Sequence, residues 1–401
     1  MDILGRYYTN QIFSKLLIDN LSISNPKNIV ELGVGDGALF RAAFERWSNA
    51  SFYVTDIDDH SIQRMRTEFE FPNVKSFQLD TIKENIIERL NICDSIDIAI
   101  CNPPYLKVNP TPDILTIFEK AQLDECKDLK KITSDVLFLA KNLEILVRKG
   151  ELGIILPDGL ITGKEFISLR SSLLTSHNIK AVIQLPENIF KKTEALTHIV
   201  IIEKGSSTSS YVPVFLSNEL GKIVDQIDID QDALVERMDY KYNKWKKANQ
   251  FCTNQICLKH LKPIIKRGNK THKELKNLKI KYLHSTNLPN LSINLDLGGE
   301  ESKSFDGFVC AEPGDIIISR VGKIGKMAKI KSGKLPISDC LLKITLPDIQ
   351  ALALWNSLTS EEGKEWFKAN SHGVCAKVIS LSDLMNFPIK NAASSEKIAE
   401  E

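Results

Sequence analysis

At 401 residues, with 43% hydrophobic and 26% charged residues, the chain has an ordinary globular composition and is long enough for two or three domains. No apolar stretch approaches the roughly 20 residues of a membrane span, and no leader pattern opens the chain. We therefore expect a cytoplasmic protein without membrane partners. The eight cysteines form no Cys-x-x-Cys pair and no histidine pair has zinc-finger spacing, which favours free thiols and no metal site. The formal net charge of +1 conceals two halves of opposite sign.

The first 205 residues alternate between short β-branched runs and longer helical patterns. The runs expected as strands are 28–32, 51–55, 74–79, 96–100, 153–156, 180–185 and 197–203. The helical patterns between them include 38–47, 59–69 and 134–148. This alternation predicts an α/β fold, in which a mostly parallel sheet is covered by helices on both faces and ligands bind at the carboxyl ends of the strands. A serine-rich stretch at 205–210 is expected to be a loop or hairpin tip, and residues 211–240 the end of this domain or a bridge.

A glycine-rich turn follows the first expected strand and precedes a helix. Its sequence is Glu31-Leu-Gly33-Val-Gly35-Asp-Gly37, and glycine lets the backbone turn sharply and approach a ligand closely. The spacing differs from the Gly-x-Gly-x-x-Gly of nicotinamide-binding folds, and the acid ahead of the first glycine favours a cationic ligand over a pyrophosphate. A purely structural turn remains the alternative at this point.

Two acids stand at the ends of the next two expected strands. Asp56 ends the second strand, where a carboxylate can accept hydrogen bonds from two ribose hydroxyls. Asp80 ends the third strand and can accept a hydrogen bond from an adenine amino group. Either acid alone could be a helix N-cap. Their placement at successive strand ends, together with the glycine turn, predicts a nucleoside pocket.

The fourth expected strand runs straight into Asn102-Pro103-Pro104-Tyr105. The prolines fix their own φ near −65° and push the residues before them into extended conformations. The side-chain oxygen of Asn102 and the carbonyl of Pro103 can then accept both hydrogens of one amino group, which selects an amine over a keto or hydroxyl group. The ring of Tyr105 offers a flat surface on which a base can stack. As a bare tetrapeptide, the same residues could also form a rigid surface turn.

The second half of the chain is basic. Residues 1–240 hold 26 basic and 35 acidic residues, whereas residues 241–401 hold 26 basic and 16 acidic residues. Within 241–280 alone, 12 residues are basic and one is acidic. This asymmetry indicates a polyanion-binding half or, alternatively, a solvated lysine-rich surface. Isolated strands are expected at 279–283, 307–310, 315–319 and 340–345, and a frayed polar tail at 391–401.

Taken together, the motifs of the first half resemble the gamma class of N6-adenine DNA methyltransferases, which includes the modification subunits of type I restriction systems. The resemblance implies S-adenosylmethionine as the cofactor and an adenine flipped out of the duplex as the methyl acceptor. The cofactor-binding residues that it implies are Thr9, Glu31, Gly33, Gly35, Gly37, Asp56, Asp80 and Asn102. The catalytic residues that it implies are Asn102, Pro103, Pro104 and Tyr105.

Two further segments extend the resemblance within the first half. The stretch Gly-Arg-Tyr-Tyr-Thr at residues 5–9 resembles the motif that precedes the fold and touches the cofactor. Asn10 stands where the family usually has a proline, and this departure concerns the contact made by Thr9. Residues 185–190 resemble the later segment of the family, in which a phenylalanine, here Phe190, packs against the flipped base beside Tyr105.

Residues 258–390 resemble one target-recognition domain of type I specificity subunits, through the stretches 258–261, 281–287, 313–325 and 379–384. The resemblance implies a class I S-adenosylmethionine-dependent methyltransferase domain with a Rossmann-like fold at 1–240 and an α+β DNA target recognition domain at 241–390. Around the glycines of 313–325, the basic side chains of Arg320, Lys323 and Lys326 suit contacts to DNA phosphates. His284, Ser285, Thr286 and Asn287 are polar candidates for reading bases, although His284 could equally be an ordinary histidine.

The combined interpretation is a site-specific DNA N6-adenine methyltransferase, the modification component of a restriction-modification or related defence system. Double-stranded DNA is its expected partner, with a homodimer or restriction and specificity subunits as further partners. Two alternatives remain open. A protein-glutamine or RNA amino-methyltransferase would carry the same tetrapeptide, but the C-terminal half argues against it. A non-catalytic DNA-binding specificity subunit would not need the intact glycine turn and tetrapeptide.

Overall fold

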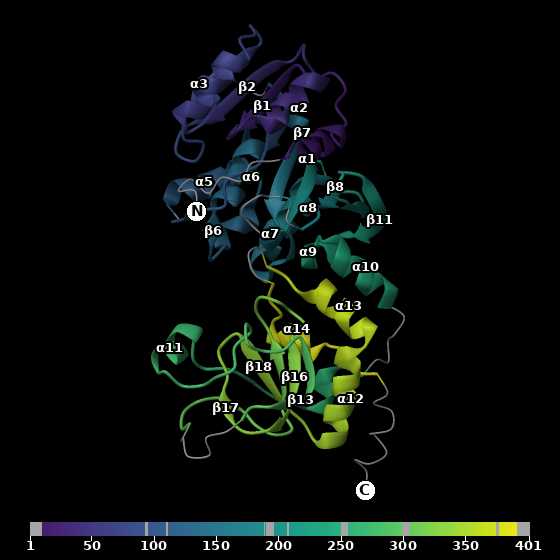
Figure 1. The fold of residues 1–401 in the computed structure, drawn as a ribbon. Helices are drawn as coiled ribbons and strands as arrows, with labels where there is room; N and C mark the ends of the chain where they lie inside the picture. The colour runs from purple at the N-terminus through teal and green to yellow at the C-terminus, as the bar shows by residue number, and fades with distance from the viewer. Residues whose placement is uncertain are drawn as a thin grey trace. The chain divides into compact units, whose positions relative to one another are not determined.

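The computed structural model describes residues 10–92, 95–109, 111–187, 189, 196–206, 208–249, 256–298, 305–373 and 377–390. The chain divides into two compact units, Met1–Asn243 and Lys244–Glu401, which run from purple to teal and from green to yellow in Figure 1. This division falls inside α10 (Tyr240–Asn249), whereas the boundary that we expect after residue 240 coincides with the first turn of that helix. The roles expected for the two units remain predictions.

A nine-stranded sheet forms the centre of the described part of the N-terminal unit, in the order β11-β10-β8-β9-β7-β4-β1-β2-β3. β9 runs antiparallel to both of its neighbours, and β11 runs antiparallel to β10 at one edge. The remaining pairs are parallel. The strands are β1 (Asn28–Leu32), β2 (Ser51–Asp56), β3 (Val74–Gln78), β4 (Ile96–Cys101), β7 (Leu146–Pro157), β8 (Asn178–Gln184), β9 (Thr197–Glu203), β10 (Tyr211–Ser217) and β11 (Ile223–Asp230).

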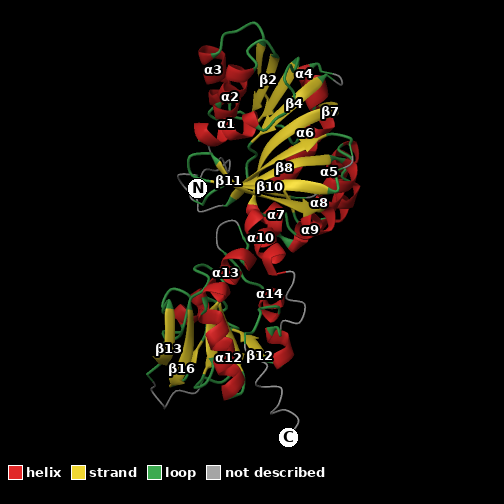
Figure 2. Ribbon diagram, turned by 90° about the vertical axis from the view of Figure 1, so that its right-hand side faces the viewer, coloured by secondary structure: helices red, strands yellow, loops and turns green. Residues whose placement is uncertain are grey.

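Helices cover both faces of this sheet (Figure 2). Alternate residues of a strand point to opposite faces, so Ile29 and Val30 of β1 belong to two different hydrophobic cores. One core is completed by α1 (Gln11–Asp19), α2 (Ala38–Arg46) and α3 (Asp59–Glu68). The other is completed by α4 (Ile86–Leu90), α5 (Pro112–Lys120), α6 (Ser134–Ile145), α7 (Asp158–Thr162), α8 (Ile167–Ser176) and α9 (Gln231–Glu236). The predicted α/β class with two covered faces is confirmed.

The predicted strands of this unit are all present, but one predicted helix boundary needs correction, and one of two alternatives for 205–210 is excluded. The helix predicted at 134–148 ends at Ile145, because residues 146–148 already belong to β7 and Leu146 pairs with Ile96 of β4. The stretch at 205–210 joins β9 to β10, which are separated by β8 in the sheet, so it is not the tip of a hairpin. Residues 211–240 extend the sheet and therefore end the first domain.

The C-terminal unit has a five-stranded sheet in the order β12-β18-β15-β16-β13 and a separate pair of β14 and β17. These strands are β12 (Ile264–Arg267), β13 (Leu291–Asp296), β14 (Cys310–Ala311), β15 (Ile316–Ser319), β16 (Met327–Ser332), β17 (Leu335–Pro336) and β18 (Leu341–Thr345). The helices are α11 (His272–Asn277), α12 (Asp348–Thr359), α13 (Glu361–Asn370) and α14 (Leu381–Met385). Residues from α12, α13 and α14 form a core on one face of the sheet, and a smaller core lies on the other face.

The strand predicted at 279–283 is wrong. Lys279 has a left-handed φ of 54°, and within this stretch a single bridge joins Leu283 to Ile337. The strand predicted at 307–310 is reduced to Cys310, the first residue of β14. The strands at 315–319 and 340–345 are confirmed as β15 and β18. None of the described helices is both long and apolar enough to cross a membrane.

Candidate active site

A cavity of about 440 Å³ lies at the carboxyl ends of β1, β2, β3 and β4. Parallel strands end at the same edge of a sheet, so the segments that follow these four strands meet around one space. Of the residues singled out in the sequence, those that line the cavity are Glu31, Gly33, Gly35, Asp56, Asp80, Asn102 and Pro104. The structure therefore brings the glycine turn (residues 33–37) together with the proline segment (residues 102–106).

The glycine turn is fixed by the end of β2. The backbone N–H groups of Gly33 and Val34 both donate to the carbonyl of Thr55, at 2.9 and 2.8 Å. Gly33 has a φ of 81°, and a Cβ atom there would lie 3.3 Å from the ring of Phe138, which also lines the cavity. This position therefore needs glycine for both its conformation and its space. Gly37 caps the start of α2 and is not among the residues that line the cavity.

Asp56, the last residue of β2, holds the glycine turn through its carboxylate. One carboxylate oxygen accepts the N–H of Gly35 at 2.8 Å, and the other accepts the N–H of Asp58 at 2.9 Å. Both carboxylate oxygens therefore fix the backbone around the cavity. Asp56 thus shapes the cavity as well as lining it.

Glu31 lies in β1 and is almost completely buried, with 3% of its surface exposed. Burial raises the pKa of its carboxyl well above the usual value, and the nearby carboxylates of Asp36 and Asp56 raise it further. Among the described residues, its buried Oε2 atom has no hydrogen-bond partner. A buried acid of this kind is stabilised in its charged form by a cation that enters the cavity.

Asp80 follows β3 by two residues and lines the cavity with 24% of its side chain exposed. Its Oδ1 atom accepts the N–H groups of Ile82 and Lys83, at 3.1 and 3.3 Å. The ammonium of Lys83 lies 3.2 Å from its Oδ2 atom. Asp80 therefore closes the turn after β3 and still presents a carboxylate at the cavity.

The proline segment continues from β4 into a small two-stranded ribbon. β5 (Lys107–Val108) pairs with β6 (Ile132–Thr133), which leads directly into α6. At the first residue of α6, the buried hydroxyl of Ser134 donates to the carbonyl of Pro104 and accepts the N–H of Leu106 at 2.8 Å. Asn102 and Pro104 line the cavity, whereas Pro103 and Tyr105 are not among its lining residues.

The sequence analysis missed Ser134 and Phe138, which both line the cavity. They lie on the expected helix at 134–148, where a serine at the start suggests no more than a helix N-terminus and a phenylalanine suggests core packing. No pattern in this stretch distinguishes these two residues from those of an ordinary helix start. Thr9 and Phe190 lie outside the described residues.

The basic residues singled out in the C-terminal unit differ in their surroundings. Lys323 is exposed. Lys326 donates to two backbone carbonyls, those of Ser285 and Leu288, at 3.1 and 3.0 Å. Burial, followed by the charge of Arg267, lowers the pKa of Arg320. Of the three, Lys323 is the side chain best placed to reach a ligand from solvent.

The polar candidates at 284–287 mainly support the fold. His284 is 8% exposed, and its Nδ1 atom lies 2.7 Å from the hydroxyl of Ser338. Burial lowers the pKa of His284, and the neighbouring His272 ring, stacked 4.2 Å away, lowers it further. Asn287 accepts the N–H of His284 and donates to the carbonyl of Tyr282 at 2.9 Å.

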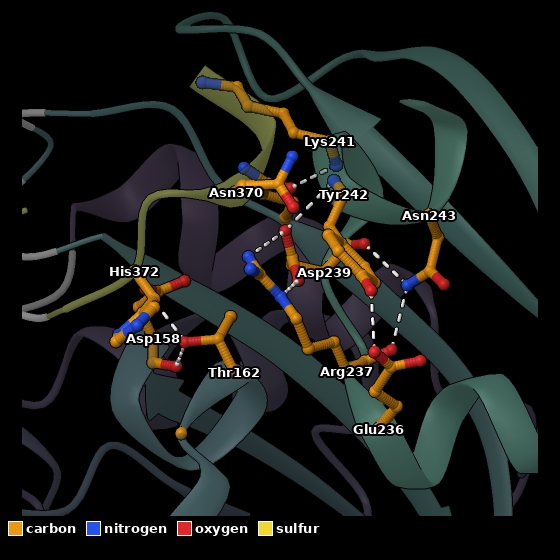
Figure 3. Close-up of polar contacts among 12 residues, drawn as sticks. Asp158, Thr162, Glu236, Arg237, Asp239, Lys241, Tyr242, Asn243, Asn370 and His372 are labelled. Atoms are coloured by element: carbon orange, nitrogen blue, oxygen red, sulfur yellow. Dashed lines mark hydrogen bonds and ion pairs between the residues drawn. The ribbon is translucent and has the colours of Figure 1, made fainter. Parts of the chain in front are cut away.

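A second polar cluster lies at the same edge of the large sheet, beyond β4. Asp158 directly follows β7, and its Oδ1 atom lies 3.0 Å from Nε2 of His198 in β9, with both side chains buried. In Figure 3, Arg237 forms an ion pair with Asp239 at 2.7 Å. The ring of Tyr242 lies 4.3 Å from the Arg237 guanidinium. None of these five residues lines the cavity, and the three segments that carry them, around 158, 198 and 237–242, are far apart in the sequence and gave no motif to recognise.

The comparisons with known proteins find a family match and several methyltransferase relatives. Residues 2–260 match the family described as N-6 DNA Methylase. The methylase subunit of the type I restriction enzyme EcoEI of Escherichia coli is 22% identical over 222 residues, which cover 51% of this chain and 43% of that subunit. The release factor glutamine methyltransferase of Flavobacterium psychrophilum is 25% identical over 107 residues, which cover 26% of this chain and 36% of that protein. Each match spans less than half the length of the relative.

The solved structures with a similar fold include one whose alignment covers this chain from end to end. The type IIG restriction endonuclease BpuSI gives a TM-score of 0.53 at 14% identity, with 100% of this chain and 61% of that chain covered. At this identity the likeness concerns the fold, and it includes the C-terminal unit as well as the sheet that carries the cavity.

Proposed function

Because this chain belongs to the N-6 DNA methylase family, we propose that it transfers a methyl group from S-adenosylmethionine to the 6-amino group of adenine in double-stranded DNA. The observation that carries this proposal is the single cavity that joins the glycine turn to the proline segment. A site for a methyl donor and a site for an amine would then adjoin in one space. The order β3-β2-β1-β4 in the sheet, which brings these segments to one edge, and the family both support a methyl donor at that edge.

The residues at the glycine end suit S-adenosylmethionine. The buried carboxylate of Glu31 suits the ammonium of the amino-acid part, and the glycine turn lets the backbone approach the ligand. Asp56 suits the ribose hydroxyls and Asp80 the adenine amino group. When bound, this cofactor supplies a methyl group on a positively charged sulfur, which an uncharged amine can attack.

The proline segment suits the acceptor amine. The side-chain oxygen of Asn102 and the carbonyl of Pro103 would accept the two hydrogens of one –NH₂ group. These two bonds select an amine and draw it toward tetrahedral geometry, which frees its lone pair. No strong base is needed, because the proton leaves only after the nitrogen has become acidic. Catalysis would rest on alignment and on polarisation of the amine.

An adenine can reach this cavity only outside the DNA double helix, so we propose that the base is flipped. Tyr105, between the proline pair and β5, offers the ring on which the flipped base would stack, and Phe190 is the proposed second contact. The C-terminal unit, with its excess of basic residues, would hold the DNA and select the site. Arg320, Lys323 and Lys326 are the proposed phosphate contacts.

We also propose that the chain is the modification component of a restriction-modification or related system, with further subunits or a second copy as partners. The similarity to a type I methylase subunit supports this setting. The alignment with a type IIG restriction endonuclease over the whole chain supports a DNA-related role for the C-terminal unit.

Transfer to DNA can be tested directly. The purified chain is incubated with S-adenosylmethionine and genomic DNA from a host without adenine methylation, and the DNA is then read by methylation-sensitive long-read sequencing. We expect N6-methyladenine at one recurring sequence. Unmodified DNA together with normal cofactor binding would contradict the proposal and favour a non-catalytic DNA-binding subunit.

A second candidate function is methylation of a glutamine side-chain amide in a protein. The similarity to a release factor glutamine methyltransferase favours it, because an amide –NH₂ offers the same two hydrogen-bond donors as adenine. A labelled methyl group offered to DNA, to transfer RNA and to a release factor in parallel separates the candidates. Label in the release factor or the RNA, with none in DNA, would replace our first proposal.

A further inference from the structure

The backbone on both sides of Tyr105 is bonded to one hydroxyl group. The carbonyl of Pro104 belongs to the peptide that precedes Tyr105, and the N–H of Leu106 belongs to the peptide that follows it. The Ser134 hydroxyl donates to that carbonyl and accepts from that N–H, the second bond being 2.8 Å long. One side chain therefore fixes both peptide planes that meet at the Cα atom of Tyr105, and with them the φ and ψ angles of this residue.

Ser134 is itself held in place. It is completely buried, and its own N–H donates to the carbonyl of Leu106 at 2.8 Å. The residue before it, Thr133, pairs with Lys107 in the ribbon of β5 and β6. As the first residue of α6, Ser134 has an N–H that the helix does not use, which frees it for the contact with Leu106.

The proline segment needs such support because of its composition. Prolines have no N–H, so Pro103 and Pro104 cannot join β4 to a neighbouring strand by donating hydrogen bonds. Before this segment, the thiol of Cys101 donates to the carbonyl of Leu32 in β1. After it, regular pairing resumes at Lys107. Between Cys101 and Lys107, the Ser134 hydroxyl forms hydrogen bonds with the backbone of the proline segment.

We propose that Ser134 is a positioning residue, whose hydroxyl sets the direction of the Tyr105 ring against the base that accepts the methyl group. The inference rests on the proposed function, since it assigns to Tyr105 a stacking role in that reaction. Although Ser134 lines the cavity, its hydroxyl is hydrogen-bonded to Pro104 and Leu106, so we assign it a role through Tyr105 and not through contact with the reacting atoms. Its removal should slow methyl transfer and leave binding of S-adenosylmethionine nearly unchanged.

The first experiment compares Ser134→Ala and Ser134→Thr with the wild-type chain. The readout is transfer of a tritiated methyl group to genomic DNA that lacks adenine methylation, with cofactor affinity measured by calorimetry. We expect Ser134→Ala to lower kcat about 10- to 100-fold, because misplacement of a group by about 1 Å has an effect of that size. Ser134→Thr keeps the hydroxyl and should recover most of the rate.

Ser217→Ala is the matched control. Ser217 is also buried, and its hydroxyl also donates to a backbone carbonyl, that of Gln184 at 3.2 Å, but it lies at the end of β10. A loss of stability alone would affect both alanine variants in the same way. If kcat falls equally in the two variants, or if Ser134→Thr is as slow as Ser134→Ala, the positioning role is wrong.

A double-mutant cycle with Tyr105→Ala provides the sharper test. If Ser134 acts through Tyr105, the rate of the double variant should equal that of Tyr105→Ala, because the ring to be positioned is already absent. If Ser134→Ala lowers the rate by the same factor in the Tyr105→Ala background as in the wild-type chain, the two substitutions act independently and the inference is wrong. A wild-type chain that transfers no methyl group to DNA contradicts the proposed function, whereas an active wild type with an equally active Ser134→Ala contradicts the positioning role alone.

Discussion

The glycine turn and the proline segment line one cavity, yet they are supported in different ways. The glycine turn has N–H groups of its own, and these donate to the carbonyl of Thr55 and to the carboxylate of Asp56 at the end of the adjacent strand. The proline segment contains two residues without an N–H, and its support includes a hydroxyl from the start of a helix, Ser134. The glycine turn, which has its backbone N–H donors, is held by the adjacent strand β2. The proline segment lacks two of these donors and depends on a side chain that is distant in the sequence.

The largest effect is expected from Asn102→Ala. Loss of one oxyanion-hole donor lowers kcat by about 10²- to 10³-fold in acyl transfer, and we expect an effect of that size from loss of the Asn102 amide, which polarises the amine in the proposed mechanism. Because the glycine turn is supported independently, the affinity for S-adenosylmethionine should remain within a few-fold. Single-turnover methyl transfer and calorimetry measure the two quantities.

Two outcomes for Asn102→Ala would contradict the separate roles of the glycine turn and the proline segment. Retained methyl transfer would show that Asn102 does not polarise the acceptor amine. A large loss of cofactor affinity would show that the two ends of the cavity are coupled, in agreement with the cofactor contact that the resemblance implies for this residue. Asn109→Ala is a suitable control, because Asn109 also lines the cavity but follows β5.

The opposite pattern is expected from Asp56→Ala. The substitution removes the proposed acceptor of the ribose hydroxyls together with the acceptor of the Gly35 and Asp58 N–H groups, and a hydrogen bond to a charged group contributes about 1.5–3 kcal/mol. Since about 1.4 kcal/mol corresponds to a factor of ten, cofactor affinity should fall about 10- to 100-fold. Asp56→Asn keeps one acceptor oxygen, so its cofactor affinity should lie between that of the wild-type chain and that of Asp56→Ala.

The rate at saturating cofactor decides whether Asp56 belongs to the glycine end alone. We expect kcat of Asp56→Ala to stay near the wild-type value once the cofactor concentration is raised. Asp59→Ala, an exposed acid in the first turn of α3, is the control for a general charge effect. A fall of kcat with unchanged affinity would reverse the assignment.

The same contrast explains which parts of the site could be predicted from the sequence. Asp56 and Asp80 were predictable because each follows a β-branched run, and the parallel strands place such residues at one edge. Ser134 lies 30 residues from Pro104, and nothing in the local pattern distinguishes it from an ordinary helix start. The hydrogen bonds that Ser134 makes to the proline segment form only in the tertiary fold, so the local sequence pattern does not reveal them.

Errors in the predicted elements have a similar origin. Residues 146–148 continue an apolar pattern without glycine or proline, so the sequence gives no sign that α6 ends at Ile145. Pairing of Leu146 with Ile96 decides the outcome. The alternating residues at 279–283 suggest a strand, but the left-handed φ of Lys279 turns the chain after α11, so that Leu283 alone makes a bridge. Tertiary contacts override the local pattern in both places.

A smaller effect is expected from pH at the glycine end. Burial and the neighbouring acids raise the pKa of Glu31, so the ligand-free carboxyl takes up a proton at a higher pH than its ordinary value of 4.5. A cationic ligand binds to the charged form and must displace that proton. Cofactor affinity should therefore be full above the raised pKa and fall as pH decreases through it, by at most about tenfold per pH unit for one proton.

Stability of the ligand-free chain should respond to pH in the opposite direction. Because the folded state holds the Glu31 proton more tightly than the unfolded state, this group contributes stability at low pH that is lost as pH rises through the raised pKa. Calorimetric binding across this range and thermal melting without cofactor test both signs. Glu31→Gln should remove both dependences, and an unchanged pH profile in this variant would exclude Glu31 as their source.

The smallest effect is expected from Lys323→Gln in the C-terminal unit. Lys323 is exposed, and a single phosphate contact contributes about 0.9 to the slope of log K against log salt concentration for double-stranded DNA. The variant should reduce this slope by about one unit and weaken binding to all DNA sequences alike, since phosphate contacts carry no base information. Lys222→Gln, which replaces an exposed lysine between β10 and β11, should leave the slope unchanged.

If cofactor affinity and kcat at saturating DNA stay constant in Lys323→Gln, DNA contact by Lys323 is separable from both ends of the cavity. If instead Lys222→Gln alters the slope as much as Lys323→Gln, the charge of the whole chain, and not the C-terminal unit, attracts DNA.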